Sequence, residues 1–365
     1  MLKFCNKKTI LTFTNTSFDA TGGIERFVIE QSIKLSMDVD RVIIVFMDSV
    51  LMIIKGRKKP IKILFMSLLY SIITADLIII HDPQIYKTYL KYGLFARLIG
   101  KEVVLVTHGL FFHTPHNMIV KRILEPLLLW LATRATICLA VGYGDYNRLL
   151  RYGTNVLLFG NGIENPKVAS DSHRFDGLKV NDIIEFIYVG RDSYNKRVLL
   201  LVEVFACYFL KSFPFARLTL IGPKFTVHTH KLVKKYSKIN ISVFEGVSDA
   251  RLMDFMSKSH FLLSASSYEG FGRTVVEAAS VGVIPIVNKN PGHNFILKEL
   301  DIDLSLEYGI ESEIENALSH LTDILNNNIS NSISVKIQEK AKRFIWEERN
   351  ELMHAMLSNY RNKKV

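Results

Sequence analysis

The chain contains, from Ser266 to Glu277, the stretch SSYEGFGRTVVE. It follows the short apolar run Phe261–Ser264, and its second half continues into a predicted helix, Arg273–Ser280. We predict a strand–loop–helix corner that binds an anion, because the glycines admit a ligand close to the main chain and the amides at a helix start attract negative charge. Glu269 in the loop and Glu277 in the helix can each accept hydrogen bonds from neighbouring hydroxyls.

Short apolar segments alternate with longer amphipathic ones along the rest of the chain, a pattern typical of parallel sheets with helices on both faces. A polar stretch from residue 167 to 182 separates two such runs, and 365 residues exceed what one core usually holds. We therefore predict two α/β domains. We expect helices at Gly23–Ser36, Val198–Lys211 and Asp249–Lys258, and strands at Ile10–Thr14, Arg41–Phe46, Leu77–Ile80, Glu102–Thr107, Ala135–Val141, Val156–Leu158, Glu185–Val189, Arg217–Ile221, Ile241–Phe244, Phe261–Ser264 and Val283–Val287.

Ligands of open α/β sheets bind outside the carboxyl ends of the strands, so the loops that follow strands are the places to search. Arg191 and Lys196 follow the predicted strand Glu185–Val189 directly. Two cations in one turn can converge on a diphosphate, since Arg binds it as a fork and Lys as a point charge. In isolation they would be interpreted as surface charges, but their position after a strand favours an anion site.

A glycine pair, Gly22 and Gly23, stands between the first predicted strand and the helix that follows. Glycines before a helix start suit the close approach of a phosphate or a sugar. The alternative is an ordinary glycine-containing turn.

Together these motifs resemble the large family of retaining glycosyltransferases often called family 4, or glycosyl transferases group 1. The resemblance rests on E-G-F-G-x-x-x-x-E at Glu269–Glu277, on Arg191 and Lys196, and on the loop at Gly22 and Gly23. It covers essentially the whole chain. Two features depart from the family pattern: the Pro-Glu that often precedes the lysine is absent, and Gly142–Gly144 stands where a serine is common.

The resemblance implies the GT-B fold, in which two Rossmann-like domains face each other across a cleft. We expect an acceptor-binding domain at residues 1–172 and a nucleotide-sugar-binding domain at residues 173–340. Residues 341–365 would form a helix that returns to the first domain, and the apolar stripe of the tail predicts one long helix from Glu339 to Tyr360.

The resemblance also implies roles for single residues. Arg191 and Lys196 would contact the donor diphosphate, Glu269 the hexose and Glu277 the ribose. His108, which follows strand Glu102–Thr107, would point at the transferred sugar. The catalytic set is then His108, Glu269, Arg191 and Lys196, and the donor-binding set is Gly22, Gly23, Arg191, Lys196, Glu269, Gly270, Phe271, Gly272 and Glu277, with Phe271 and Gly272 acting through their amides.

A narrower likeness concerns the substrates. The stretch Phe111–Thr114 resembles α-mannosyltransferases of bacterial exopolysaccharide assembly. It favours GDP-mannose as donor, with a UDP-sugar as the alternative, and a polyprenyl-diphosphate-linked glycan as acceptor. No cofactor is expected. No metal is expected either, because basic residues and helix dipoles replace it in this fold.

Charge and apolar patterning suggest contact with a membrane surface. Residues 1–180 carry 23 Lys and Arg against 14 Asp and Glu, which favours an anionic partner. Lys55, Arg57, Lys58, Lys59 and Lys62 precede an apolar run that we interpret as a helix at about residues 63–74 and then a strand, not a membrane span. Three dispersed cysteines favour a reducing compartment, so we expect a cytoplasmic protein, peripheral on the inner face of the membrane.

Other readings of the sequence remain open. A nucleotide-sugar epimerase or a phosphorylase with the same fold is the nearer rival, and a basic nucleic-acid-binding protein is further away because no reader motif is present. A metal site made of His108, His113 and His116 lacks the usual spacings and partners. Asp38–Asp40 and Asp301–Asp303 mimic a metal-binding D-x-D, but neither follows a predicted strand in the required way.

Overall fold

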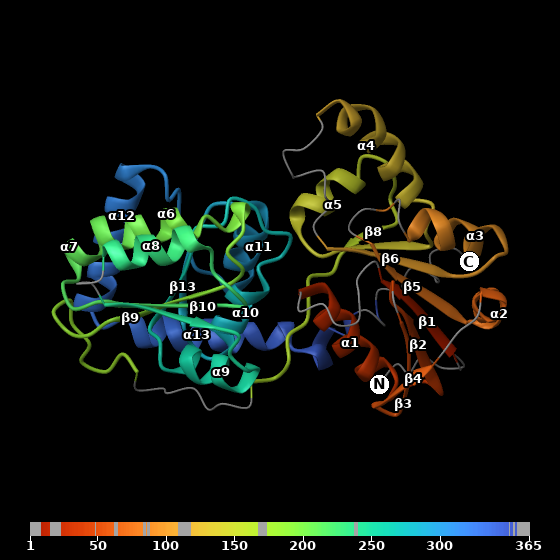
Figure 1. The fold of residues 1–365 in the computed structure, drawn as a ribbon, viewed down its shortest axis with the longest axis horizontal. Helices are drawn as coiled ribbons and strands as arrows, with labels where there is room; N and C mark the ends of the chain where they lie inside the picture. The colour runs from red at the N-terminus through yellow and green to blue at the C-terminus, as the bar shows by residue number, and fades with distance from the viewer. Residues whose placement is uncertain are drawn as a thin grey trace. The chain divides into compact units, whose positions relative to one another are not determined.

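The computed structural model describes residues 9–14, 23–47, 49–61, 65–82, 85, 88–108, 118–166, 174–236, 240–349, 351–352 and 355. These residues fall into two compact units (Figure 1). Unit 1 takes in the described residues up to Glu164 and those from Phe344 onward, and unit 2 runs from Asn165 to Arg343. The sequence prediction places the two borders after residues 172 and 340.

Unit 1 is built on an eight-stranded sheet with the order β4-β3-β2-β1-β5-β6-β7-β8. Every position of β1, β5, β6 and β7 is buried, which explains why β5, β6 and β7 appear in the sequence as nearly continuous apolar runs. The elements are β1 (Thr9–Thr14), α1 (Gly23–Leu35), β2 (Arg41–Val45), β3 (Val50–Ile54), β4 (Arg57–Ile61), α2 (Phe65–Thr74), β5 (Leu77–His81), η1 (Tyr89–Gly93), α3 (Leu94–Leu98), β6 (Val103–Thr107), α4 (Met118–Ala132), β7 (Ile137–Ala140), α5 (Tyr143–Leu149) and β8 (Val156–Leu158).

The edge of this sheet differs from the prediction of parallel strands alone. β3 pairs with β2 and β4 with β3 in antiparallel fashion. The turn between β3 and β4 is Lys55-Gly56, with φ of 46° and 76°, as a two-residue hairpin turn requires. Of the basic residues that precede α2, Arg57, Lys58 and Lys59 lie in edge strand β4, while Lys62 lies outside the described residues.

Unit 2 is built on a six-stranded parallel sheet with the order β11-β10-β9-β12-β13-β14. Helices α6, α8 and α12 lie on one face, and α9, α10 and α13 on the other (Figure 1). The elements are β9 (Glu185–Val189), η3 (Tyr194–Lys196), α6 (Val198–Val204), η4 (Phe205–Phe209), α7 (Leu210–Ser212), β10 (Arg217–Gly222), α8 (Val227–Lys235), β11 (Ile241–Glu245), α9 (Asp249–Ser257), β12 (Phe261–Ser264), α10 (Arg273–Ser280), β13 (Ile284–Asn288), α11 (Pro291–Leu300), β14 (Ser305–Leu306), α12 (Glu311–Asn326) and α13 (Ser330–Ala341). The predicted α/β class with two sheets is confirmed.

The C-terminal segment is not the single long helix predicted from Glu339. Helix α13 ends at Ala341, a 3-10 turn η5 (Lys342–Phe344) follows, and Ile345 forms a bridge with Ile163. The reason is backbone pairing: the Ile163 N–H donates to the Phe344 carbonyl at 2.8 Å, and the Trp346 N–H donates to the Ile163 carbonyl at 3.1 Å. These bonds replace the ones that would continue the helix.

After this break the chain packs on unit 1. The Trp346 side chain is fully buried, and its indole N–H donates to Glu30 of α1 at 2.8 Å. Arg349 donates to the Phe159 carbonyl at 2.6 Å. The Trp346 ring lies against Gly162 so closely that a side chain there would overlap it.

None of the helices in the described part of the chain combines the length and apolarity needed to cross a membrane. The apolar run before β5 forms helix α2, and it ends before Asp76, whose carboxylate accepts the Thr9 N–H at 2.9 Å. The predicted helix followed by a buried strand is therefore confirmed for this segment.

Replacing Gly162 with alanine tests the packing of Trp346. The added Cβ would overlap the buried ring, so we expect the free energy of unfolding to fall by about 1–3 kcal/mol. Urea unfolding followed by tryptophan fluorescence measures the change. Gly309→Ala is the control, because no heavy atom lies within 4 Å of the place that its new Cβ would take. Equal midpoints for the two variants would contradict the packing argument.

Candidate active site

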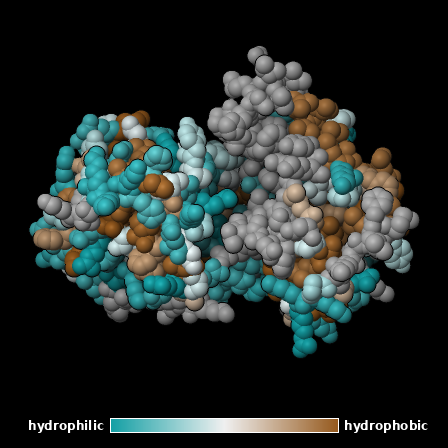
Figure 2. Space-filling model, in the orientation of Figure 1, coloured by the Kyte–Doolittle hydropathy of each residue, from teal (hydrophilic) through white to brown (hydrophobic). Residues whose placement is uncertain are grey.

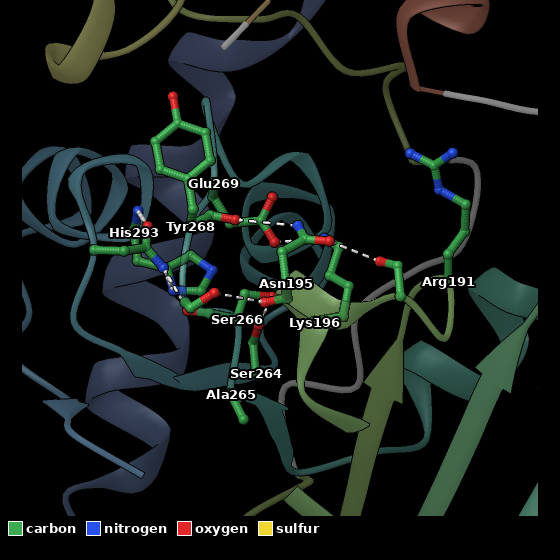
Figure 3. A network of polar contacts seen from close by, with 12 residues as sticks. Arg191, Asn195, Lys196, Ser264, Ala265, Ser266, Tyr268, Glu269 and His293 are labelled. Atoms are coloured by element: carbon green, nitrogen blue, oxygen red, sulfur yellow. Dashed lines mark hydrogen bonds and ion pairs between the residues drawn. The ribbon is translucent and has the colours of Figure 1, made fainter. Parts of the chain in front are cut away.

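The loops that carry the predicted anion-binding residues of unit 2 meet because their strands are neighbours. β9 and β12 pair in parallel, with Phe186 opposite Phe261, so both chains leave the sheet at the same edge. The Ser267 N–H donates to the Asn195 carbonyl at 2.8 Å, and Arg197 donates to the Ala265 carbonyl at 2.6 Å. The segment that contains Arg191 and Lys196 is thereby fixed to the segment that contains Glu269 (Figure 3).

Lys196 and Glu269 form an ion pair, with Nζ donating to Oε1 (Figure 3). Their side chains expose only 20% and 16% of their surface. Burial acts to raise the pKa of Glu269, but the charge of Lys196, with smaller contributions from His293 and Ser266, outweighs it and holds this pKa below its ordinary value. Glu269 is therefore a carboxylate at neutral pH.

Arg191 lies in the same loop but not in this ion pair. Its carbonyl accepts the Tyr188 hydroxyl at 3.0 Å, and its guanidinium lies apart from the Lys196–Glu269 pair in Figure 3. The next residue, Asp192, accepts the Thr226 N–H and the Thr229 hydroxyl, each at 2.7 Å. Burial opposes ionisation of Asp192, but these bonds lower its pKa below the ordinary value. The loop is thus held to helix α8 beside Arg191.

The start of helix α10 has the backbone that the glycines of the motif predict. Gly272 caps the helix with φ 93° and ψ 46°, a conformation that side chains disfavour, and a Cβ there would lie 3.2 Å from the His293 ring. The Phe271 side chain is buried and packs against Phe295, with ring centroids 5.8 Å apart. Phe271 can therefore serve a ligand only through its backbone, and Gly270 precedes it in the same loop.

Glu277 is in contact with a residue that the sequence motifs did not single out. Arg273, one turn earlier in α10, donates from Nε to Glu277 Oε1 at 2.7 Å. Both side chains are mostly buried, with 14% and 16% exposed. The pair fixes the direction of the Glu277 carboxylate, a geometry that follows from the four-residue spacing of the two residues.

Helix α11 supports the Glu269 loop, a role that the sequence did not predict. A Cβ at Gly292 would lie 2.8 Å from Glu269 Cβ, so the two segments are in close contact. Asn290 donates to the Ser266 carbonyl at 2.9 Å. His293 is buried, burial lowers its pKa despite the opposing charge of Glu269, and its Nδ1 lies 2.7 Å from the Asn288 carbonyl. The stretch Asn290-Pro291-Gly292-His293, one residue after strand β13, is the sequence signal from which this support could have been predicted.

In unit 1 the predicted His108 follows β6 and is half-buried. Its Nε2 lies 3.0 Å from Nδ1 of His81, the last residue of β5. Burial lowers the pKa of His108 to about 4, although Asp145 acts in the opposite direction. His81 and Asp145 therefore lie near His108, and the sequence motifs pointed to neither of them. Gly23 is the first residue of α1, whereas Gly22, His113 and His116 lie outside the described residues.

The candidate metal ligands lie only in part within the described residues, since His113 and His116 fall outside them. Among the residues that the structure describes, no three His, Cys, Asp or Glu side chains come together as metal ligands. Asp301 caps the C-terminus of α11 with φ 56° and is paired with Lys336 and Lys340. This supports its interpretation as a surface acid.

Unit 2 resembles a known family of proteins. Residues 169–344 match the family model of the glycosyl transferases group 1. Unit 2 is therefore similar to the glycosyl transferases group 1 family over this range. Within it, the Lys196–Glu269 contact and the Gly272 cap occupy the loops that follow β9 and β12.

Two curated relatives extend the likeness. The chain is 29% identical over 234 residues to the GDP-mannose:cellobiosyl-diphosphopolyprenol alpha-mannosyltransferase of Xanthomonas campestris, with 62% of this chain and 59% of the relative covered. A protein of the same description from Komagataeibacter xylinus is 25% identical over 220 residues, covering 58% and 53%. The chain thus matches less than two thirds of the length of each relative.

Solved structures share the fold over nearly the full chain. Sucrose-phosphate synthase from Thermosynechococcus elongatus gives a TM-score of 0.74 at 14% identity, covering 97% of this chain and 99% of that one. The Anabaena HepE protein in complex with UDP-glucose gives 0.71 at 16% identity, covering 96% and 99%. At these identities the likeness concerns the fold, which is GT-B.

Replacing Lys196 with methionine tests the electrostatics of the unit 2 site. Burial would then act on Glu269 without its cation, so we expect the pKa of Glu269 to rise above its ordinary value. The folded state would lose stability as pH rises through the usual glutamate range, whereas the wild-type carboxylate loses its stabilising effect as pH falls. Urea unfolding at several pH values, or NMR of the labelled carboxyl group, measures this.

Lys258→Met is the matched control for that prediction. Its ion pair with Asp254 is exposed, with 71% of the Lys258 side chain in contact with solvent. Exposed pairs contribute little to stability, so the pH profile should not change. A Glu269 pKa that stays low in Lys196→Met would refute the role given to Lys196.

Proposed function

We propose that this protein is a glycosyltransferase that moves a hexose from a nucleotide sugar to a glycan acceptor with retention of configuration. The observation that carries the proposal is the meeting of Lys196, Glu269 and the Gly272 helix cap in the loops after β9 and β12. Cations, a carboxylate and a helix start suit the diphosphate and the hydroxyls of a nucleotide sugar. The family match over residues 169–344 supports it.

In the proposed reaction, Arg191 and Lys196 bind the diphosphate and stabilise the charge that develops as it leaves. The bond between the sugar's anomeric carbon and the phosphate oxygen breaks, and a bond from the acceptor oxygen forms on the same face. The departing phosphate oxygen takes the acceptor's proton, so no separate general base is required. Catalysis is then mainly electrostatic. Glu269 orients the hexose, Glu277 the ribose, and the Gly272 and Phe271 amides face the diphosphate.

We further propose contact between His108 of unit 1 and the transferred sugar, and donor contact by the loop at Gly22 and Gly23. GDP-mannose is the favoured donor, with a UDP-sugar as the alternative, and a polyprenyl-diphosphate-linked oligosaccharide is the proposed acceptor. The printed descriptions of the two curated relatives, which refer to GDP-mannose and a diphosphopolyprenol, support this choice. The reaction would need neither a metal ion nor a cofactor.

A lipid-linked acceptor fits a cytoplasmic enzyme that works peripherally on the inner face of the membrane. Unit 1 exposes large apolar side chains, among them Tyr70 at 67%, Leu98 at 85% and Trp130 at 42%. Figure 2 shows hydrophobic surface on this unit. Together with basic side chains such as Arg57 and Lys58, these groups suit an anionic lipid surface. Salt-sensitive binding to anionic but not to neutral vesicles tests this part of the proposal.

The function itself is tested with a panel of GDP- and UDP-sugars. The protein is incubated with each donor in EDTA, with and without a lipid-linked oligosaccharide, and released nucleotide and elongated glycan are measured. Acceptor-dependent release with a longer glycan supports the proposal. An altered nucleotide sugar with no release would indicate an epimerase, and consumption of inorganic phosphate a phosphorylase; either result would refute transfer.

The two cations give a sharper prediction. We expect Arg191→Ala and Lys196→Ala each to lower kcat by about 100-fold or more, since each removes a charge that stabilises the leaving diphosphate. Initial rates at saturating donor measure the loss. Arg217→Ala and Lys258→Ala are the matched controls, because both residues form exposed ion pairs away from these loops. Near-normal rates in either test variant would remove the role assigned to that residue.

A further inference from the structure

Two histidines meet in unit 1 at the ends of neighbouring strands. β5 and β6 pair in parallel with His81 opposite Val106, so His81 and His108 emerge at the same edge. Nδ1 of His81 lies 3.0 Å from Nε2 of His108, and the ring centroids are 5.2 Å apart with an interplanar angle of 28°. The distance is that of a hydrogen bond between the two rings.

Burial determines the kind of hydrogen bond that the rings can form. His81 is fully buried, and burial, reinforced by His108, lowers its pKa well below the ordinary value. The pKa of His108 is lowered to about 4 by burial, which the nearby Asp145 carboxylate only partly offsets. At neutral pH both rings are uncharged, so one nitrogen of the contact donates its N–H and the other accepts it.

The backbone around His81 is fixed. His81 lies between Thr14 of β1 and Val106 of β6 in the sheet. The next residue, Asp82, is buried and accepts the N–H groups of Thr88 and Tyr89 at 2.7 and 3.0 Å. A ring held on a central strand in this way has little freedom to move, so it can orient a neighbour that lies on a loop.

We infer that His81 is a positioning residue for His108. The contact holds Nε2 of His108, so the His81 ring fixes the orientation of the His108 ring, and the tautomer of His81 fixes the tautomer of His108. The inference rests on the proposed function only in taking the ligand to be the transferred sugar or its acceptor. The hydrogen bond between the rings stands on geometry alone.

NMR of the full-length protein with labelled histidines tests the ring pair without any sugar transfer. We expect a scalar coupling across the hydrogen bond between His81 Nδ1 and His108 Nε2, and one dominant tautomer for His108. Absence of this coupling in the folded protein overturns the inference. Because this measurement needs neither a variant nor a substrate, it gives an answer even if the proposed reaction is wrong.

Variants of His81 distinguish a role in positioning His108 from a role in packing alone. We expect His81→Phe to lower kcat by about tenfold or more with a small change in donor KM, and to give mixed His108 tautomers by NMR. His81→Asn keeps a polar group at the Nδ1 position and should restore most of kcat and the single tautomer. Thermal unfolding identifies any variant that fails to fold. If folded His81→Phe leaves kcat and the His108 tautomer unchanged, His81 does not position His108.

Discussion

Parallel pairing places the carboxyl ends of neighbouring strands at the same edge of a sheet, and the sites of both units depend on this constraint. β9 and β12 are neighbours in unit 2 although 71 residues separate the end of one from the start of the other along the chain. Their loops therefore meet, and Lys196 reaches Glu269. The bonds from Ser267 to Asn195 and from Arg197 to Ala265 hold the two loops in one arrangement.

Charge in the unit 2 site is balanced locally. Taking two ions out of water costs several kcal/mol for each, and their attraction offsets this only when the pair is in good contact. Lys196 and Glu269 meet that condition with little exposure, and Arg273 with Glu277 does the same in helix α10. In the proposed reaction, the lysine that this carboxylate holds in place would bind the diphosphate. The proposed transfer relies on this preorganisation, since electrostatic catalysis needs charges that do not have to move.

Unit 1 has the same arrangement of neighbouring parallel strands, but two histidines meet there in place of an ion pair. β5, β6 and β7 are neighbours in the sheet. His81 is the last residue of β5, His108 follows β6, and Asp145 lies in helix α5 after β7. Burial, complete for His81 and partial for His108, keeps both imidazoles neutral, so a hydrogen bond takes the place of an ion pair. Unit 2 thus presents charges suited to an anionic leaving group, and unit 1 a neutral, oriented ring suited to hydroxyl groups.

The sequence by itself determined the fold class and the strands, because buried parallel strands are unbroken apolar runs between turn residues. It also named Lys196, Glu269 and Gly272 as candidates, since these residues stand in the segments that follow strands β9 and β12. It missed the β3–β4 hairpin, whose Lys55-Gly56 turn lacks the usual Asn-Gly signal, and it extended the last helix through a break that exists only because Ile163 pairs with Phe344 and Trp346.

Only the tertiary structure decided which side chains meet. The contacts between Lys196 and Glu269 and between His81 and His108 join residues 73 and 27 positions apart in the chain. The support of Glu269 by Gly292 depends on the order of strands in the sheet. Local periodicity carries no information about that order, which is why the sequence identified several members of each site but not their partners.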